Sequence, residues 1–112
     1  MKNELLIVWS TDNKETVLNL ICLYAYNAKM KGWFDEVTIL VWGASQQVLC
    51  EDFEIKEKVK EMGEAGIKFI ACKKCSENMY IEEQLSTCGI EIYYTGEFLS
   101  EWLKSGKPVL TF

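Results

Sequence analysis

The sequence predicts a single α/β domain with a mostly parallel five-stranded sheet between two layers of helices. Short β-rich segments alternate with helical patterns along the chain, which is typical of such domains. The first three of these segments are almost continuously apolar, as are strands that helices cover on both faces. The 112 residues suffice for one hydrophobic core and are too few for two, so we expect residues 1–112 to form one domain.

The expected strands are rich in β-branched and aromatic residues. They occupy residues 4–9, 36–42, 67–72, 90–94 and 108–112. Helical patterns lie between them, at residues 14–31, 45–64, 76–88 and 97–105. The second helical pattern is weak near residues 50–53, where we expect the helix to break.

Turn and cap residues mark the ends of these helices. Glycine adopts left-handed backbone conformations without a Cβ penalty and therefore often ends a helix. The glycines in such positions, each shortly before the next strand, are Gly32, Gly66, Gly89 and Gly106. Short polar side chains that accept hydrogen bonds from free amides favour helix starts. The residues expected to do so are Asp12, Ser45, Ser76 and Thr95.

The composition excludes several kinds of chemistry. Hydrophobic residues make up 49% of the chain and charged residues 26%, and the net charge of −5 argues against binding to nucleic acid or anionic membranes. The chain contains no histidine, and all 12 basic residues are lysine. Histidine-based catalytic triads, imidazole metal ligands and bidentate arginine contacts to phosphate are therefore excluded. The five cysteines are the main reactive side chains that remain.

Cysteine usage and the lack of sorting signals bear on the compartment. Five cysteines cannot all pair in intramolecular disulfides. The first residues lead directly into a strand pattern rather than a signal peptide, and no apolar segment approaches the roughly 20 residues that span a bilayer. We expect a reduced, soluble, cytoplasmic protein with no membrane partner.

The most specific motif is the C-x-x-C of Cys72 and Cys75, placed where the third strand ends and a helix begins. Sites in parallel α/β sheets gather beyond the carboxyl ends of the strands. Free amides at the helix N-terminus, the charges of Lys73 and Lys74 and the second thiol would all lower a thiol pKa here. We therefore predict that Cys72 is an accessible, easily ionised nucleophile with Cys75 as its partner. Lys73, Lys74 and Ser76 are expected to stabilise the anion.

Three other interpretations of this motif stay open. It can be half of a zinc site, for which Cys50 or Cys88 would have to complete the ligands. It can be a thioredoxin-type dithiol, although that fold places a cis-proline opposite the motif and the only proline here is Pro108. It can also be an inert pair. We predict no metal, and we predict no cofactor because the glycine-rich nucleotide-binding motifs are missing from the sequence.

The other three cysteines are expected to be structural. Cys22 lies in a helical pattern and Cys88 at the end of another, so both are interpreted as small hydrophobic residues. Cys50 is followed by two carboxylates, Glu51 and Asp52, which would raise its pKa and discourage thiolate formation.

Residues that follow the other strands are candidates for the walls of a pocket around the motif. They offer hydroxyl, carboxylate and amide groups, and their glycines allow close approach of the backbone. The predicted pocket-lining residues are Ser10, Thr11, Asp12, Asn13, Gly43, Ala44, Ser45, Thr95 and Gly96. Trp9 and Trp42, at the ends of the first two strands, are positioned to line its mouth. Each of these residues can equally be a helix cap or a turn former.

The first helical pattern, residues 14–31, is apolar almost all around its axis. A helix packed on a sheet with its other side in water needs an apolar stripe of only about 100°. We therefore predict that this helix forms a homo-oligomer interface. The alternative is partial cover by the chain's own loops, with Tyr24 and Tyr26 half exposed.

Segments 8–12, 41–45, 66–75, 90–97 and 108–112 resemble those of the DsrE/DsrF-like proteins of the DsrEFH superfamily. The resemblance covers essentially the whole chain and implies a flavodoxin-like α/β/α domain that assembles into trimers or hexamers. It also implies a sulfur relay, in which a cysteine at the end of the third strand accepts sulfane sulfur as a persulfide and passes it on. Cys72 matches that cysteine.

The predicted function is therefore that of a persulfide carrier of the sulfurtransferase type, with sulfur donor and acceptor proteins as its partners. A simple relay does not require the second cysteine, Cys75. A dithiol–disulfide redox protein and a non-catalytic oligomer are the alternatives.

Overall fold

The computed structural model describes residues 2–112 and contains the predicted α/β architecture. Five strands form one sheet in the order β4-β3-β2-β1-β5, and every neighbouring pair is parallel. The strands are β1 (Glu4–Trp9), β2 (Glu36–Val41), β3 (Lys68–Cys72), β4 (Glu91–Tyr93) and β5 (Val109–Thr111). Each strand lies within the range that its sequence pattern predicts.

Three of the four predicted helices consist of several segments. The helices are α1 (Lys14–Thr16), η1 (Val17–Cys22), α2 (Leu23–Met30), α3 (Ala44–Glu51), α4 (Phe53–Glu64), α5 (Lys73–Met79), α6 (Glu82–Thr87) and α7 (Thr95–Ser105). The first three are continuous and form the predicted first helix, in which η1 is a π-helical stretch. The break expected in the second helix is confirmed at Asp52, whose carboxylate accepts a hydrogen bond from the Ile55 amide at 3.0 Å and so begins α4.

The prediction of a helix over residues 76–88 is wrong at its start and in its middle. The chain enters α5 directly from β3, without the loop that the sequence suggested, so α5 begins at Lys73. Tyr80, in the left-handed conformation with φ 59°, ends α5 before α6 begins. Because α5 starts early, Cys75 lies in its first turn, close to the end of β3.

The predicted helix ends are confirmed and the predicted N-caps are not. All four glycines expected to end helices have φ between +70° and +98°. By contrast, Asp12, Ser45, Ser76 and Thr95 do not occupy N-cap positions. The residues found there are Asn13, Gly43, Cys72 and Tyr94. The helices α3, α5 and α7 begin within three residues of the end of the preceding strand. The expected cap residues Ser45, Ser76 and Thr95 therefore fall inside the first turn of their helices and are buried.

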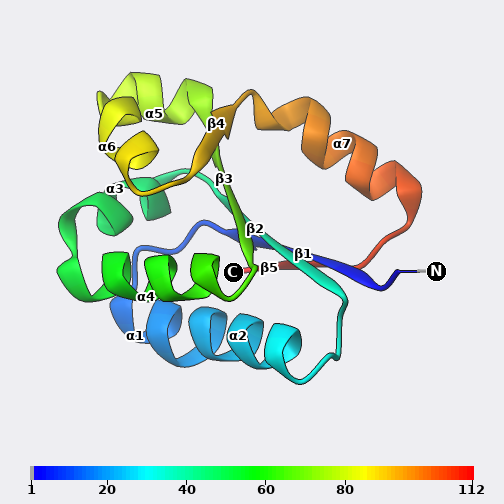
Figure 1. The fold of residues 1–112 in the computed structure, drawn as a ribbon. Coiled ribbons are helices and arrows are strands. Elements are labelled where there is room, and N and C mark those ends of the chain that lie inside the picture. Colours follow the sequence, from blue (N-terminus) through cyan, green and yellow to red (C-terminus); the bar gives the residue numbers. More distant parts are fainter. Residues whose placement is uncertain (1) are drawn as a thin grey trace.

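The strand order explains how the helices are divided between the two faces. Steps from β1 to β2 to β3 to β4 all move in one direction across the sheet. Right-handed crossovers therefore place the intervening helices on the same face. The step from β4 to β5 moves back past β1, which places α7 on the opposite face. Figure 1 shows α4 and the α1–α2 helix on one side of the sheet and α7 on the other.

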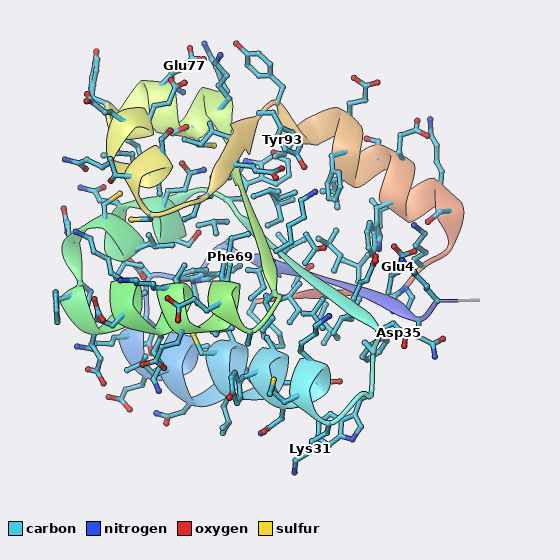
Figure 2. The ribbon with its side chains drawn as sticks, viewed as in Figure 1. Glu4, Lys31, Asp35, Phe69, Glu77 and Tyr93 are labelled. Carbon is cyan, nitrogen blue, oxygen red and sulfur yellow. The ribbon has the colours of Figure 1, made fainter. Side chains whose placement is uncertain are left out.

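The hydrophobic core is divided by the sheet into two unequal parts. The larger part packs β1, β2 and β3 against the first helix, α3, α4 and α6, and it includes Ile7, Ile39 and Phe69. Phe69 is labelled between β3 and α4 in Figure 2. The smaller part packs the other face against α7, with Leu6, Leu40 and Ile70 fully buried.

One side of the first helix remains uncovered. Its large exposed apolar side chains, together with one that follows it, are Leu20, Leu23, Tyr26, Met30 and Trp33. A groove of about 300 Å³ lies between this helix and α4. The residues that line it are Leu18, Cys22, Leu23, Tyr26, Lys58, Glu61 and Met62. Within residues 2–112, no helix combines the length and the apolar character of a membrane span.

Candidate functional site at the end of β3

The strand order brings two chain segments to Cys72, one from each neighbouring strand. β3 pairs with β2 on one side, where Ala71 is opposite Val41. It pairs with β4 on the other side, where Cys72 is opposite Tyr93. The loop that begins at Trp42 and the start of α7 at Thr95 therefore flank the C-x-x-C.

Backbone contacts hold Cys72 firmly in place. It is the N-cap residue of α5, with an extended backbone of φ −73° and ψ 118°. Its carbonyl oxygen accepts hydrogen bonds from Ser76 Oγ at 2.8 Å and from Gln46 Nε2 at 3.2 Å. Both donors are completely buried. Cys72 itself is only 5% exposed, which corrects the expectation of an accessible sulfur.

The surroundings of the Cys72 sulfur favour its ionised form. Burial alone raises its pKa, but nearby hydrogen-bond donors oppose that effect. The donors that lower the pKa are the backbone amide and the thiol of Cys75, the hydroxyl of Thr95 and the backbone amide of Lys74. Their combined effect holds the pKa of Cys72 below its ordinary value, as is typical of a cysteine at the start of a helix.

The second sulfur behaves in the opposite way. Burial and the hydrogen bond that Cys75 shares with Cys72 raise the pKa of Cys75, although donors from the Gly43 amide and the Trp42 side chain oppose this. Gly43 has φ +70° and ψ −136°, a conformation that L side chains rarely adopt. The pair is therefore asymmetric: Cys72 ionises first, and Cys75 stays protonated and donates to it.

The predicted anion-stabilising residues lie around the pair in different ways. The ammonium of Lys73 is 5.6 Å from the centre of the Tyr94 ring. Lys74 is exposed and contributes its backbone amide to the Cys72 sulfur. The Ser76 hydroxyl donates to the carbonyl oxygens of Cys72 and Lys73, at 2.8 and 3.0 Å. Ser76 thus positions the backbone of the motif.

An exposed aromatic side chain lies beside the cysteines. The Tyr94 hydroxyl contacts Glu77 Oε1 of α5 at 3.2 Å, so it links the start of α7 to α5. Figure 2 labels Glu77 on α5 and the neighbouring Tyr93 on β4 in the same part of the molecule. Tyr94 and Lys73 therefore lie on the outer side of the candidate site.

The residues that follow β1 begin two strands away from Cys72, because β2 lies between β1 and β3. The amides of Ser10 and Thr11 donate to the carbonyl oxygen of Phe112, at 2.7 and 3.2 Å, and the Ser10 hydroxyl donates to it at 2.9 Å. Asn13 caps α1 by accepting from the Thr16 amide at 2.9 Å, and Asp12 is exposed. The donors of Ser10 and Thr11 are therefore paired with Phe112, and the Asn13 side chain is used to cap α1.

The loop after β2 is divided between structural and site roles. The buried Ser45 hydroxyl donates to the carbonyl oxygens of Trp9 at 2.6 Å and Trp42 at 2.9 Å, which ties the ends of β1 and β2 together. Ala44 is the first residue of α3. Gly96, in the first turn of α7, is exposed, and its carbonyl oxygen accepts from Ser100.

One residue of the site was missed by the sequence analysis. Gln46 is fully buried, and its Nε2 bridges the carbonyl oxygens of Val41 at 3.1 Å and Cys72 at 3.2 Å. The sequence feature that could have identified it is an amide side chain in the first turn of the helix that follows the second strand. The side chain of Trp42, predicted to line the mouth, lies close enough to Cys75 to lower the pKa of that thiol.

The other cysteines lie outside this arrangement. Burial raises the pKa of Cys22 to about 11, and burial also raises the pKa of Cys50. Cys88 is half-buried, and all five cysteines are free thiols. Among residues 2–112, no group of three or more cysteine, aspartate or glutamate side chains converges in a way that could hold a metal ion.

The structure has a flavodoxin-like α/β fold of the DsrE type, with two free cysteines at the end of the third strand. The chain belongs to the same family as the conserved protein of unknown function BT1422 from Bacteroides thetaiotaomicron. The two sequences are 37% identical, and the aligned region covers 98% of this chain and 95% of that one, with a TM-score of 0.96.

Two more distant structures show the same fold. The ychN protein from E. coli is 17% identical over 100% of both chains, with a TM-score of 0.69. The protein of unknown function MTH1491 from Methanobacterium thermoautotrophicum is 18% identical over 98% of this chain and 99% of its own, with a TM-score of 0.79. No family model matches the sequence, and no curated protein matches it.

Proposed function

We propose that this protein is a persulfide carrier that uses Cys72. The observation that carries the proposal is the set of hydrogen-bond donors around the Cys72 sulfur, which lowers its pKa although it is buried. A thiolate is the form of cysteine that attacks sulfur. The amides of α5 and the ammonium groups of Lys73 and Lys74 stabilise the anion. The DsrE-type fold, in which this position is a strand end, supports the same conclusion.

The loading step is an attack on a sulfane sulfur. The Cys72 thiolate attacks the outer sulfur of a donor persulfide, R–S–SH, and the donor S–S bond breaks. The products are Cys72–S–SH and the thiolate R–S⁻, which leaves with the electron pair of the broken bond. An acceptor thiolate then attacks the outer sulfur and releases the Cys72 thiolate, so no net oxidation occurs. Because Cys72 is only 5% exposed, small donors fit this step best.

The contact between the two sulfurs favours a second candidate function, that of a sulfur reductase. The Cys72 and Cys75 thiols are close enough to shift each other's pKa, which supports Cys75 reaching a persulfide on Cys72. Attack of the Cys75 thiolate on the inner sulfur forms the Cys72–Cys75 disulfide and releases HS⁻. The two thiols supply the two electrons, and a dithiol protein must reduce the disulfide afterwards. Such cycling requires a reducing compartment such as the cytoplasm.

Intact-protein mass spectrometry after treatment with one equivalent of polysulfide tests the carrier. We expect additions of roughly 32 Da, the mass of one sulfur, that disappear in Cys72→Ser. Cys88→Ser is the matched control, since it removes a half-buried thiol outside the site and leaves the additions unchanged. Additions that persist in Cys72→Ser would contradict the proposal and leave the non-catalytic oligomer as the alternative.

Sulfide release separates the carrier from the reductase. If the protein is a reductase, the wild type releases sulfide when a dithiol reductant is present, and Cys75→Ser does not. A pure carrier shows the same slow release in both proteins. Equal rates would therefore exclude the resolving role of Cys75.

We also propose that the protein is a homo-oligomer, a trimer or a hexamer, that assembles through the first helix. The support is the exposed apolar side of that helix and the groove beside α4. Contiguous apolar surface of this kind marks protein–protein contacts. Donor and acceptor proteins of the relay are the other partners that this function requires.

A further inference from the structure

The start of α7 holds a buried hydroxyl that lacks a satisfactory partner. Thr95 is only 1% exposed, and within the described residues its Oγ1 makes no hydrogen bond of good geometry. Leaving a buried polar group unpaired is unfavourable, and most such groups in folded proteins are paired. A buried hydroxyl without a partner points to a group that accepts its hydrogen bond strongly only in another state of the site.

The group that the hydroxyl faces is the Cys72 sulfur. Thr95 follows Tyr93 by two residues, and Tyr93 is the strand partner of Cys72, so the side chain lies across the end of β3. The hydroxyl is also close enough to contribute to the lowered pKa of that sulfur. A neutral thiol is a weak acceptor, whereas a thiolate accepts a charge-assisted hydrogen bond.

A second buried atom without a partner provides an internal comparison. Gln46 Oε1 is also unpaired among the described residues, although Nε2 of the same side chain donates to two carbonyl oxygens. Oε1 is an acceptor only, so it cannot stabilise an anion. The Thr95 hydroxyl is a rotatable donor, and it is the unpaired group near the motif that matches a negative charge.

We propose that Thr95 is a thiolate-binding residue, whose hydroxyl turns to donate to the Cys72 sulfur when that sulfur is ionised. The inference rests on the proposed function, because it assigns to Thr95 the stabilisation of the attacking nucleophile. The backbone amides of Lys74 and Cys75 are fixed in the helix. The Thr95 hydroxyl instead improves its hydrogen bond upon ionisation, so its effect falls on the attacking form of the sulfur.

Changing Thr95 leaves the charges around the sulfur intact. The titratable groups on the chain segments around it are the Cys75 thiol, the ammonium groups of Lys73 and Lys74, the carboxylates of Glu77 and Glu97 and the phenols of Tyr93 and Tyr94. None of them is altered by Thr95→Val, which exchanges the hydroxyl for a methyl group of similar size. Thr95→Ser keeps the hydroxyl and is the matched control.

The test is the pH dependence of thiolate formation at Cys72, followed by ultraviolet thiolate absorbance and by the rate of iodoacetamide labelling of the Cys72 peptide. We expect Thr95→Val to raise the midpoint by about one pH unit, which means roughly tenfold less thiolate at any pH well below both midpoints. Thr95→Ser should restore most of the shift. A Thr95→Val profile that superimposes on the wild type would overturn the proposal, as would an equal shift in Thr95→Ser.

The pH dependence of stability distinguishes a lost hydrogen bond to the Cys72 thiolate from a packing defect in Thr95→Val. A cysteine with a lowered pKa stabilises the folded state above the unfolded-state pKa, and this contribution is lost as the pH falls through the folded-state pKa. Thr95→Val should therefore be at least as stable as the wild type at a pH low enough to protonate Cys72, where the buried hydroxyl has no strong acceptor, and should lose stability relative to the wild type as the pH rises through the folded-state pKa of Cys72. If Thr95→Val does not fold, Thr95→Ser and Thr95→Ala, which differ by the hydroxyl alone, provide the same comparison.

Persulfide loading distinguishes failure of this inference from failure of the function. If Cys72 takes up sulfur and its pH profile is independent of Thr95, the carrier stands and the role of Thr95 is wrong. If Thr95→Val shifts the pH profile but Cys72 never takes up sulfur, Thr95 binds a thiolate that does not act as a carrier.

Discussion

The two sulfurs of the C-x-x-C share one turn of helix but differ in the hydrogen bonds around them. Cys72 receives donors from α5 and Thr95 that lower its pKa, whereas burial and the contact with Cys72 raise the pKa of Cys75. At pH values between the two pKa values, the pair carries a single negative charge, on the Cys72 sulfur. This state combines a nucleophile with an adjacent proton donor.

Gly43 tests the part of the site that comes from β2. The backbone of Gly43 has φ +70° and ψ −136°. A Cβ at this position meets no neighbouring atom within 4 Å, but Gly43→Ala forces alanine into a backbone conformation that L residues rarely adopt. We expect it to lower the free energy of unfolding by about 1–3 kcal/mol. Gly63→Ala is the control, because Gly63 lies inside α4 with nothing within 4 Å of the new Cβ, and there we expect a gain of about 0.4–1 kcal/mol. Urea unfolding measures both, and equal effects would contradict the prediction.

At this scale, the sequence identified the reactive pair but not all of its surroundings. The spacing and position of Cys72 and Cys75 were sufficient to select them as candidates. The contact of Thr95 with Cys72 depends on which strands are neighbours, and neighbours cannot be read from chain order. For the same reason Ser10 was predicted near the pair, whereas it binds the carbonyl oxygen of Phe112.

Among the elements, the junction between α3 and α4 combines a helix cap with an ion pair. The Asp52 carboxylate accepts from the Ile55 amide at 3.0 Å and pairs with Lys14 of the first helix at 2.9 Å. The hydrogen bond to Lys14, with the one from Ile55, lowers the pKa of Asp52. The cap therefore joins two helices that cover the same face of the sheet.

Two variants of Asp52 separate these contributions. Asp52→Ala removes both the cap and the ion pair, so we expect a lower urea midpoint than for the wild type. Asp52→Asn keeps a cap acceptor and loses the charge, so its midpoint should lie between the two. Because the carboxylate pKa is lowered on folding, the advantage of wild type over Asp52→Asn should disappear as the pH falls through the folded-state pKa. An Asp52→Asn midpoint as low as that of Asp52→Ala would show that the cap contributes nothing.

The elements show why sequence patterns locate strands better than helix starts. The first three strands were found because buried parallel strands are almost continuous apolar runs, as in β1 and β2. The short outer strands β4 and β5 are partly exposed and were found from their β-branched and aromatic residues. The start of α5 was misplaced because the Cys72 backbone itself takes the N-cap position, with no side-chain hydrogen bond to mark it. The π-helical stretch of η1 leaves no recognisable pattern in the sequence either.

For the whole molecule, the uncovered side of the first helix determines the predicted assembly. Leu23 lies in this surface and is 56% exposed, and Leu103 on α7 is 58% exposed on the opposite face of the sheet. The two leucines therefore form a matched pair for substitution. A charge at an apolar interface is unfavourable, whereas a charge on a solvated surface is tolerated.

We expect Leu23→Glu to dissociate the oligomer to monomers and Leu103→Glu to leave its mass unchanged. Size-exclusion chromatography with light scattering at micromolar concentration measures the mass of each variant. A wild-type protein that is already a monomer would contradict the predicted assembly. A Leu23→Glu protein that keeps the wild-type mass would show that the first helix is not the interface.

The pairing of β1 with β5 also has a consequence for chain synthesis. Leu6 lies opposite Val109, so the first strand completes its hydrogen bonds only with residues that are synthesised much later. Until those residues leave the ribosome, one edge of β1 is unpaired and can recruit another strand. A nascent chain stalled before residue 106 should therefore be prone to aggregation, while the released chain closes that edge itself.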